Sequence, residues 1–455
     1  MKTTNPPGDH DPGPAAEPMF MDFLTSPGFR KYFANTSWMI GEKIIRMGVN
    51  FVVGIFIARK LGPGGYGLLS YGLSMVALFG IISSLGLDEI IVRNLVRDTW
   101  KKDRILGTTF TLRLAGAILI LILAPSISYL INSDKEAFYI VLIIAFGPIF
   151  QSFTVIDFFF HSRVQARYSS IALGTSFGIS SLLKVALICS NAGVFLFAAA
   201  YLFEYVAMAL AFVIMYEKEG HRIFQWGFLR SEASSLLHDA FPVIFSGFLM
   251  IVYSRIDQVM IKNMLGNEAV GYYSVAVTMT EAWHVIPSVL MASLFPAIIR
   301  AKTDRQEIFH DRMLHVYGLL FWMAVTVALP VSLASNWIIK LLFDGAYDQS
   351  GPVLAILIWN CIFIFLQVAN GKWIITENSQ KIWLWITPVG CAINITGNLY
   401  LISRYGIKGA ALVTLMTQFF TSHLAFVFSR KTLPVYLTQW KALTMPFLIM
   451  RRLVR

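Results

Sequence analysis

Long apolar runs alternate with short polar segments along almost the whole chain. Most runs hold about twenty residues or more, the length an α-helix needs to cross a hydrocarbon core of about 30 Å. The twelve runs occupy residues 37–58, 66–87, 107–130, 138–160, 171–190, 194–216, 241–264, 270–298, 317–334, 353–375, 382–402 and 407–428. Their apolar residues are continuous rather than alternating, which predicts membrane-spanning helices and argues against a membrane β-barrel.

A polar stretch at residues 217–238 divides these runs into six and six. We therefore predict an all-α polytopic membrane protein with about twelve transmembrane helices in two pseudo-symmetric six-helix lobes. The expected order is a disordered cytoplasmic tail at 1–27, an N-terminal lobe at 28–216, a cytoplasmic linker at 217–238, a C-terminal lobe at 239–430 and a basic cytoplasmic tail at 431–455.

The connection between the first two runs is rich in Gly and Pro. Its sequence, Leu61-Gly62-Pro63-Gly64-Gly65, forbids a continuous helix and predicts a tight turn within a helical hairpin. The segment at 61–70 also aligns with the segment at 265–274, where Leu, Gly, Gly and Ser coincide at an offset of 204 residues. Each segment joins the first two helices of its half, which indicates parallel repeats about an axis along the membrane normal.

Composition and charge support a membrane protein with a defined orientation. The chain is 56% hydrophobic and 14% charged, with a mean hydropathy of +0.64 and a net charge of +11. With the N-terminus inside, and with Lys262, Lys372 and Lys408 at the ends of runs counted with the side they adjoin, 25 of the 37 Lys and Arg residues fall on the inner side, 7 on the outer side and 5 within the spans. This bias predicts that both termini are cytoplasmic. It also accounts for the positive charge, so we expect no nucleic-acid partner.

Three segments resemble a known family of transporters. They read LGPGGYGLLSYG after the first run, SRIDQVMIKNMLGNEAVGYYSVA across the seventh and eighth, and YGIKGAALVT at the twelfth. Over about residues 28–430 the chain resembles the bacterial polysaccharide transporters, the O-antigen or exopolysaccharide repeat-unit flippases of the multidrug/oligosaccharidyl-lipid/polysaccharide exporter superfamily. The resemblance implies two six-helix lobes, a central cavity and alternating access, with an undecaprenyl-pyrophosphate-linked oligosaccharide as substrate.

Cationic side chains within the spans are the candidates for binding such a substrate. Arg46 and Arg255 lie near the middles of the first and seventh runs, and a guanidinium binds phosphate oxygens at two points. The repeat offset maps Arg46 onto Met250, so the two arginines are not strict repeat equivalents. Lys184 and Lys43 could also favour an anionic headgroup, although Lys43 could instead extend to the cytoplasmic surface.

Glu42, Arg46 and Asn50 share one helix face, because they are four residues apart, and we expect this face to line a polar cavity. Within-helix pairing of Glu42 with Arg46 is the structural alternative to substrate contact. Four carboxyls are candidates for coupling to H⁺ or Na⁺, and neutralisation of nearby Arg and Lys is their alternative role: Glu42, Glu204, Asp257 and Glu281. Asn394 and Asn398 could bind sugar hydroxyls or join helices.

The combined expectation is a lipid-linked oligosaccharide flippase of the inner membrane. The polyprenyl tail of the substrate is expected to stay in the lipid and to pass through a gap between the lobes. We expect no enzyme activity, no metal site and no direct use of ATP, since the chain has neither HExxH nor GxxxxGK[ST]. Membrane lipid, a polysaccharide polymerase and a chain-length regulator are the expected partners. The main alternative is an ion-coupled drug/cation antiporter of the same superfamily, which would favour a net acidic cavity. A peptidoglycan-precursor flippase would be expected to have fourteen helices, and a glycosyltransferase or polymerase would need a large catalytic loop.

Overall fold

The computed structural model describes residues 27–304, 306–377 and 379–444, and these residues form helices joined by short connections without any strand. The all-α prediction is therefore confirmed. The principal helices are α2 (Pro27–Ser84), α3 (Asp88–Arg97), α4 (Lys102–Asn132), α5 (Lys135–Ala145), α6 (Gly147–Gln151), α7 (Val155–Ser162), α8 (Ala166–Cys189), α9 (Val194–Lys218), α10 (Arg230–Leu265), α11 (Asn267–Glu281), α12 (Val285–Asp304), α13 (Gln306–Phe343), α14 (Ser350–Leu357), α15 (Asn360–Thr376), α16 (Trp383–Tyr405), α17 (Ile407–Ser422) and α18 (Leu433–Leu443).

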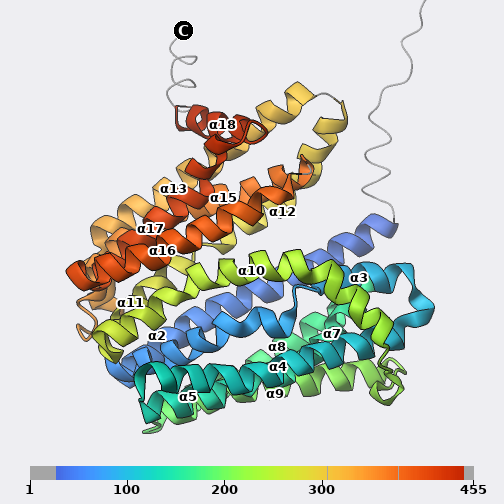
Figure 1. The fold of residues 1–455 in the computed structure, drawn as a ribbon, viewed down its shortest axis with the longest axis horizontal. Helices are drawn as coiled ribbons and strands as arrows, with labels where there is room; N and C mark the ends of the chain where they lie inside the picture. Colours follow the sequence, from blue (N-terminus) through green and yellow to red (C-terminus); the bar gives the residue numbers. More distant parts are fainter. Residues whose placement is uncertain (1–26, 305, 378, 445–455) are drawn as a thin grey trace, which may run out of the picture.

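Two groups of helices lie side by side in an elongated bundle (Figure 1). Helices α4, α5, α8 and α9 form one group, α13, α15, α16 and α17 form the other, and α2 and α10 lie between them. Ten helical stretches in the described part are long and apolar enough to cross a membrane. One of these stretches contains both limbs of α2, and the 23-residue α16 is not among the ten. If the two limbs of α2 are counted as two crossings and α16 is added, the fold has about twelve crossings, as predicted.

The hairpin at the start of the chain turns on a single residue. The predicted turn at 61–65 is wrong in extent, because only Gly62 within the 58-residue α2 has a non-helical backbone, with φ 66° and ψ 176°. Glycine adopts this positive φ without strain, and Pro63 then suits the first turn of the second limb. Figure 1 shows α2 running to the far end of the bundle and returning toward α3.

The sequence echo between the two halves corresponds to matching backbone geometry. Gly266, which lies 204 residues after Gly62, has φ 91° and ψ −179°. A Cβ added to Gly67 would lie 1.9 Å from the carbonyl oxygen of Asn267, and one added to Gly271 would lie 2.0 Å from that of Pro63. Gly67 and Gly271, like Pro63 and Asn267, are separated by the same offset. Helices α2 and α11 therefore cross in a locally pseudo-symmetric contact that requires glycine on both sides.

Three predicted spans are interrupted rather than continuous. The run at 138–160 is divided among α5, α6, a 3₁₀ turn and α7, the run at 270–298 between α11 and α12, and the run at 353–375 between α14 and α15. Pro148 lies in the first turn of α6 and has no N–H to continue the ladder from α5.

The predicted linker and tails also contain helix. Residues 230–238 begin α10, and residues 433–443 form α18. The predicted tail at residues 1–27 lies outside the described residues except for Pro27, as does the part of the C-terminal tail at 445–455.

The two lobes are joined at the end of the bundle that carries Gly62 and Gly266. Lys262 Nζ donates to Asp134 Oδ2 at 2.6 Å, and the Tyr347 hydroxyl donates to the Ala58 carbonyl at 2.8 Å. Burial opposes ionisation of Asp134, but hydrogen bonds from Lys262 and from backbone amides outweigh it and lower its pKa. A further ion pair joins Arg59 to Asp344. These contacts hold the lobes together at this end.

Candidate functional site

A polar cavity of about 360 Å³ lies between the lobes, toward the end of the bundle opposite these contacts. Its walls come from the first limb of α2, from α7 and α8 of the N-terminal half, and from α12 of the C-terminal half. Glu42, Lys43 and Arg46 line it together with Asp157 and His161, whose side chains are 3.2 Å apart. Two of the three residues on the predicted face of the first helix, Glu42 and Arg46, therefore border a cavity between helices.

Arg46 and Glu42 form an ion pair within α2. Arg46 Nε lies 3.1 Å from Glu42 Oε1, and the arginine side chain is 38% exposed whereas that of the glutamate is 12% exposed. A guanidinium carries five N–H donors, so one carboxylate contact leaves donors for a second anion. Lys43 is exposed and lines the same cavity. Asn50 is exposed and is not among the residues that line this cavity.

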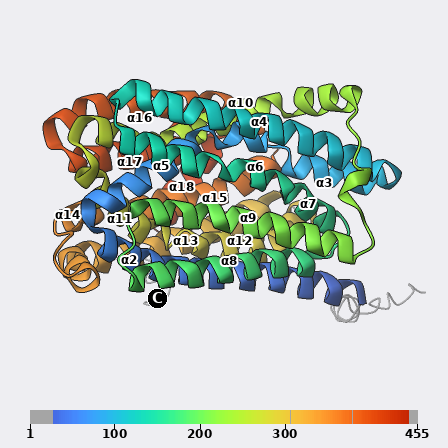
Figure 2. The same ribbon diagram turned by 90° about the horizontal axis from the view of Figure 1, so that it is seen from below.

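A second cavity begins at the same ion pair. It has a volume of about 1090 Å³ and lies between α2 and α8, with Glu42 and Arg46 at its border and mostly apolar residues elsewhere. Figure 2 shows the first limb of α2 running alongside α8. The ion pair thus stands where a polar cavity and an apolar one meet.

Arg255 belongs to a different site, in the C-terminal half. Its guanidinium lies 3.4 Å from Glu281 Oε1, and both side chains line a cavity of about 250 Å³ with Asp257 and His284. The structure therefore places Arg46 and Arg255 in separate cavities and does not bring them together as a clamp. Pairing with Glu281 is the role that the geometry favours for Arg255.

Asp257 is the most enclosed of the predicted coupling carboxyls. It is 3% exposed and accepts three hydrogen bonds from neutral groups: Asn398 Nδ2 at 2.7 Å, Thr414 Oγ1 at 2.6 Å and the Tyr273 hydroxyl at 2.9 Å. These donors come from α16, α17 and α11, so four helices meet at this carboxylate. Asn398 Oδ1 is buried beside it with no hydrogen-bond partner among the described residues. An oxygen-lined site of this kind suits a small cation or a proton.

Sequence reasoning missed two members of this site, Tyr273 and Thr414, and gave a helix-joining role as one alternative for a third, Asn398. Tyr273 lies in the repeated segment at 265–274, which supported the internal repeat and the family resemblance but assigned no role to this tyrosine. Thr414 is the last residue of YGIKGAALVT, one of the segments that carry the family resemblance, but a threonine in an apolar run is common and nothing marked it as a site residue. Asn398 was expected to bind sugar hydroxyls or to join helices, and the second role is the one observed, because it donates from α16 to Asp257 on α10 as well as to Asn394 on its own helix.

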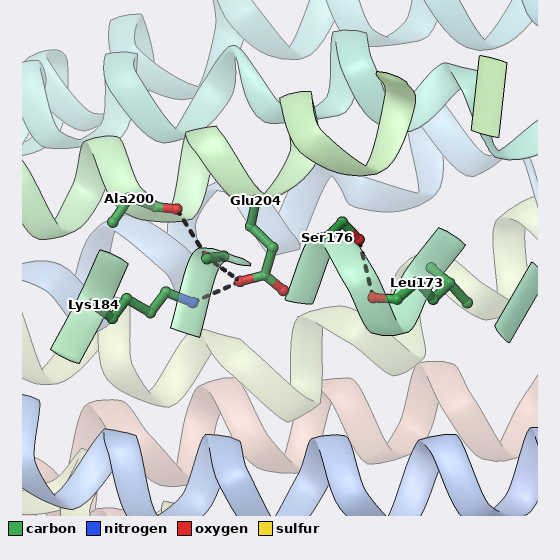
Figure 3. A network of polar contacts seen from close by, with 6 residues as sticks. Leu173, Ser176, Lys184, Ala200 and Glu204 are labelled. Atoms are coloured by element: carbon green, nitrogen blue, oxygen red, sulfur yellow. Dashed lines mark hydrogen bonds and ion pairs between the residues drawn. The ribbon is translucent and has the colours of Figure 1, made fainter. Parts of the chain in front are cut away.

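Lys184 and Glu204 neutralise each other inside the N-terminal half (Figure 3). Lys184 Nζ donates to Glu204 Oε2 at 2.6 Å, and Ser180 Oγ donates to the same oxygen at 3.1 Å. The lysine is 1% exposed and lies over the Tyr201 ring at 4.0 Å. Neither member of the pair lines the three cavities described above. The geometry favours an ion pair that joins α8 to α9.

Comparison of the sequence with known proteins identifies a matching family and two relatives. The profile of a family described as polysaccharide biosynthesis protein matches residues 32–302. A Shigella flexneri protein assigned by name to O-antigen transport is 24% identical over 377 residues, which cover 78% of this chain and 88% of that protein. An uncharacterised membrane protein of Methanocaldococcus jannaschii is 21% identical over 437 residues, covering 86% and 82% of the two chains.

Solved structures share the fold at low sequence identity. A multidrug resistance MATE family transporter of the MOP superfamily, in an inward-facing conformation, aligns with a TM-score of 0.71 at 16% identity and covers 87% of this chain and 95% of that one. The lipid II flippase MurJ, in an inward closed conformation, aligns with a TM-score of 0.68 at 14% identity, covering 90% and 92%. The helical arrangement is therefore that of a transporter fold.

Proposed function

The chain belongs to the family of polysaccharide biosynthesis proteins, and we propose that it is a flippase of the bacterial inner membrane. Its cargo is an undecaprenyl-pyrophosphate-linked oligosaccharide repeat unit, which it moves from the cytoplasmic to the outer leaflet for O-antigen or exopolysaccharide synthesis. The O-antigen transport role assigned to the Shigella flexneri relative and the flippase fold of MurJ support this proposal. A polysaccharide polymerase and a chain-length regulator would then act on the product outside.

The observation that carries the proposal is the difference between the two ends of the bundle. At one end Lys262, Tyr347 and Arg59 join the lobes, whereas a polar cavity with Lys43 and Arg46 lies between the lobes toward the other end. A cavity between lobes that are joined at one end is what alternating access requires of one of its states. The exposed Lys43 and the remaining donors of Arg46 suit an anionic pyrophosphate.

We propose Asp257 as the site that couples transport to Na⁺ or H⁺. The other three candidate carboxyls each have a cationic partner: Glu42 with Arg46, Glu204 with Lys184, and Glu281 with Arg255. Among the described residues, the side chains that donate to Asp257 are all neutral, and Asn398 Oδ1, which has no hydrogen-bond partner there, offers a further ligand oxygen. A bound cation or proton would offset the cost of a buried carboxylate.

Substitutions at Arg46 test the substrate role. In a flippase-deficient strain we expect Arg46→Lys to insert normally and to retain partial glycan export, since it keeps the charge but loses the planar fork. Arg46→Ala should insert and fail to export, and Glu42→Gln should not rescue it. Immunoblots normalise each result to protein level. Restored export in the Glu42→Gln, Arg46→Gln double variant would refute the phosphate-binding role, because only pairing would then matter.

Cysteine labelling tests the proposed orientation, with both termini in the cytoplasm. Single cysteines at Gly64, Asn267 and Asp344 should react with an impermeant thiol reagent from outside intact cells, and cysteines at Lys101 and Arg430 should not. The reason is the bias of positive charge toward one side of the membrane. Labelling of both sets from the same side would contradict this topology.

A further inference from the structure

The cavity between α2 and α8 differs from the other two in its lining. Its volume is about 1090 Å³, and apart from Glu42 and Arg46 its border is formed mainly by apolar and small side chains. The larger apolar ones include Val49 and Val53 of α2, and Phe177, Leu182 and Val185 of α8. An apolar cavity stays free of water, and one of about 150 Å³ already accommodates benzene. This cavity therefore has room for several five-carbon isoprene units.

Two glycines keep the α8 side of this cavity, hereafter the apolar groove, open. Gly174 and Gly178 are four residues apart on α8, and a Cβ built on either would meet no other atom within 4 Å. No other described residue therefore fills the space directly above these two glycines. Ile45 and Leu182, which line the same groove, are 67% and 72% exposed, so the groove extends to the outer surface of the bundle. At membrane depth that surface faces hydrocarbon.

We propose that this groove binds the isoprenoid tail of the lipid-linked substrate while its pyrophosphate contacts Arg46 and Lys43. This inference rests on the proposed function. Arg46 and Glu42 line both the apolar groove and the polar cavity between the lobes. One ligand that is apolar at one end, anionic at its junction and hydroxyl-rich at the other end matches this succession of surfaces. The tail then lies within the N-terminal half, rather than in the gap between lobes that the sequence suggested.

Photo-crosslinking tests the occupant of the groove. A photoreactive amino acid replaces Val185 in the full-length protein, which is reconstituted into phosphatidylethanolamine vesicles containing radiolabelled undecaprenyl phosphate. We expect a labelled crosslink that excess unlabelled undecaprenyl phosphate removes and that excess phosphatidylglycerol leaves in place. Equal displacement by phosphatidylglycerol would overturn the proposal, because the groove would then hold bulk lipid chains.

Filling the groove tests its use in transport. Gly178→Phe places a ring in the open space above α8, so we expect the crosslink and glycan export to fall by about tenfold or more at an unchanged protein level. Ile179→Phe is the matched control, since Ile179 is 54% exposed and does not line the groove. Gly178→Ala should retain export, which shows that bulk rather than loss of glycine is responsible.

The outcomes separate this inference from the proposed function. If Gly178→Phe exports as well as the unaltered protein at equal level, the groove is not used and the inference fails. Loss of export in Arg46→Ala would in that case still support the flippase. If the unaltered protein neither restores export in a flippase-deficient strain nor crosslinks to undecaprenyl phosphate, the proposed function itself fails.

Discussion

Asp257 and Glu204 are carboxylates on facing halves of the same bundle, and their surroundings differ in kind. Glu204 Oε2 accepts a hydrogen bond from the ammonium group of Lys184 at 2.6 Å. Asp257 instead accepts hydrogen bonds from an amide and two hydroxyls. A carboxylate beside an ammonium group is already neutralised as a pair, and its charge state contributes to holding helices together. A carboxylate among neutral donors keeps an uncompensated charge that a mobile cation can balance.

The partners of these ionisable groups, rather than their depth in the bundle, are what differ between the two halves. Lys184 and Asp257 are 1% and 3% exposed, so burial alone would rank them alike. Both lie within apolar runs, and a charge at membrane depth in itself suggests function. The nature of the contacting group therefore distinguishes the Lys184–Glu204 pair, which joins α8 to α9, from Asp257, which we propose binds a cation or a proton.

The largest effect is expected at Asp257. Asp257→Asn keeps the size of the side chain and removes its charge, so we expect transport to fall by roughly an order of magnitude or more while the protein level is retained. Export in a complementation assay, measured with and without ionophores that collapse the proton or sodium gradient, tests this. Full-rate transport with an unaltered response to the ionophores would make Asp257 a structural residue and remove the contrast with Glu204.

A smaller effect, on stability rather than on transport, is expected at the pair in the N-terminal half. Glu204→Gln leaves the buried Lys184 ammonium without its partner and so lowers the free energy of unfolding. Breaking a buried pair costs about 3–5 kcal/mol, and we expect the lower end of this range because the Glu204 side chain is 27% exposed. We expect a lower melting temperature in detergent and a lower membrane level.

The double variant Lys184→Met, Glu204→Gln provides the control for this pair. It removes both charges, so level and export should return together. Recovery of the protein level without recovery of export would show that the pair takes part in transport, and the division between the two halves would then be wrong.

The smallest effect is expected at Glu281. Arg255 Nη2 lies 3.4 Å from Glu281 Oε1, and the Glu281 side chain is 45% exposed. Such an exposed ion pair contributes about 0–1 kcal/mol to the free energy of unfolding. Glu281→Gln should therefore lower export by less than about fivefold. Export rates of this variant and Asp257→Asn, compared at equal protein level, check the order. A loss as large as that of Asp257→Asn would place the coupling site at both carboxyls.

The sequence by itself determined the class of protein, the approximate positions of the spans and the distribution of positive charge. These follow from local chemistry, since about twenty apolar residues suffice to cross the hydrocarbon core wherever they occur. The reversal of the chain near Gly62 could also be predicted from the sequence, because the effects of glycine and proline on the backbone extend over only a few residues. The pairing of Glu42 with Arg46 was foreseeable for the same reason, as both lie on one helix face.

Only the tertiary structure decided which ionisable groups meet. Lys184 pairs with Glu204, which lies twenty positions later on the next helix. The Asp257 site is formed by side chains of α10, α11, α16 and α17. Helical spacing predicts which residues share a face, but in a bundle of apolar helices it does not specify which helix that face contacts. The apolar groove beside α8 also depends on packing, because its open space over Gly174 and Gly178 exists only where no neighbouring helix fills it.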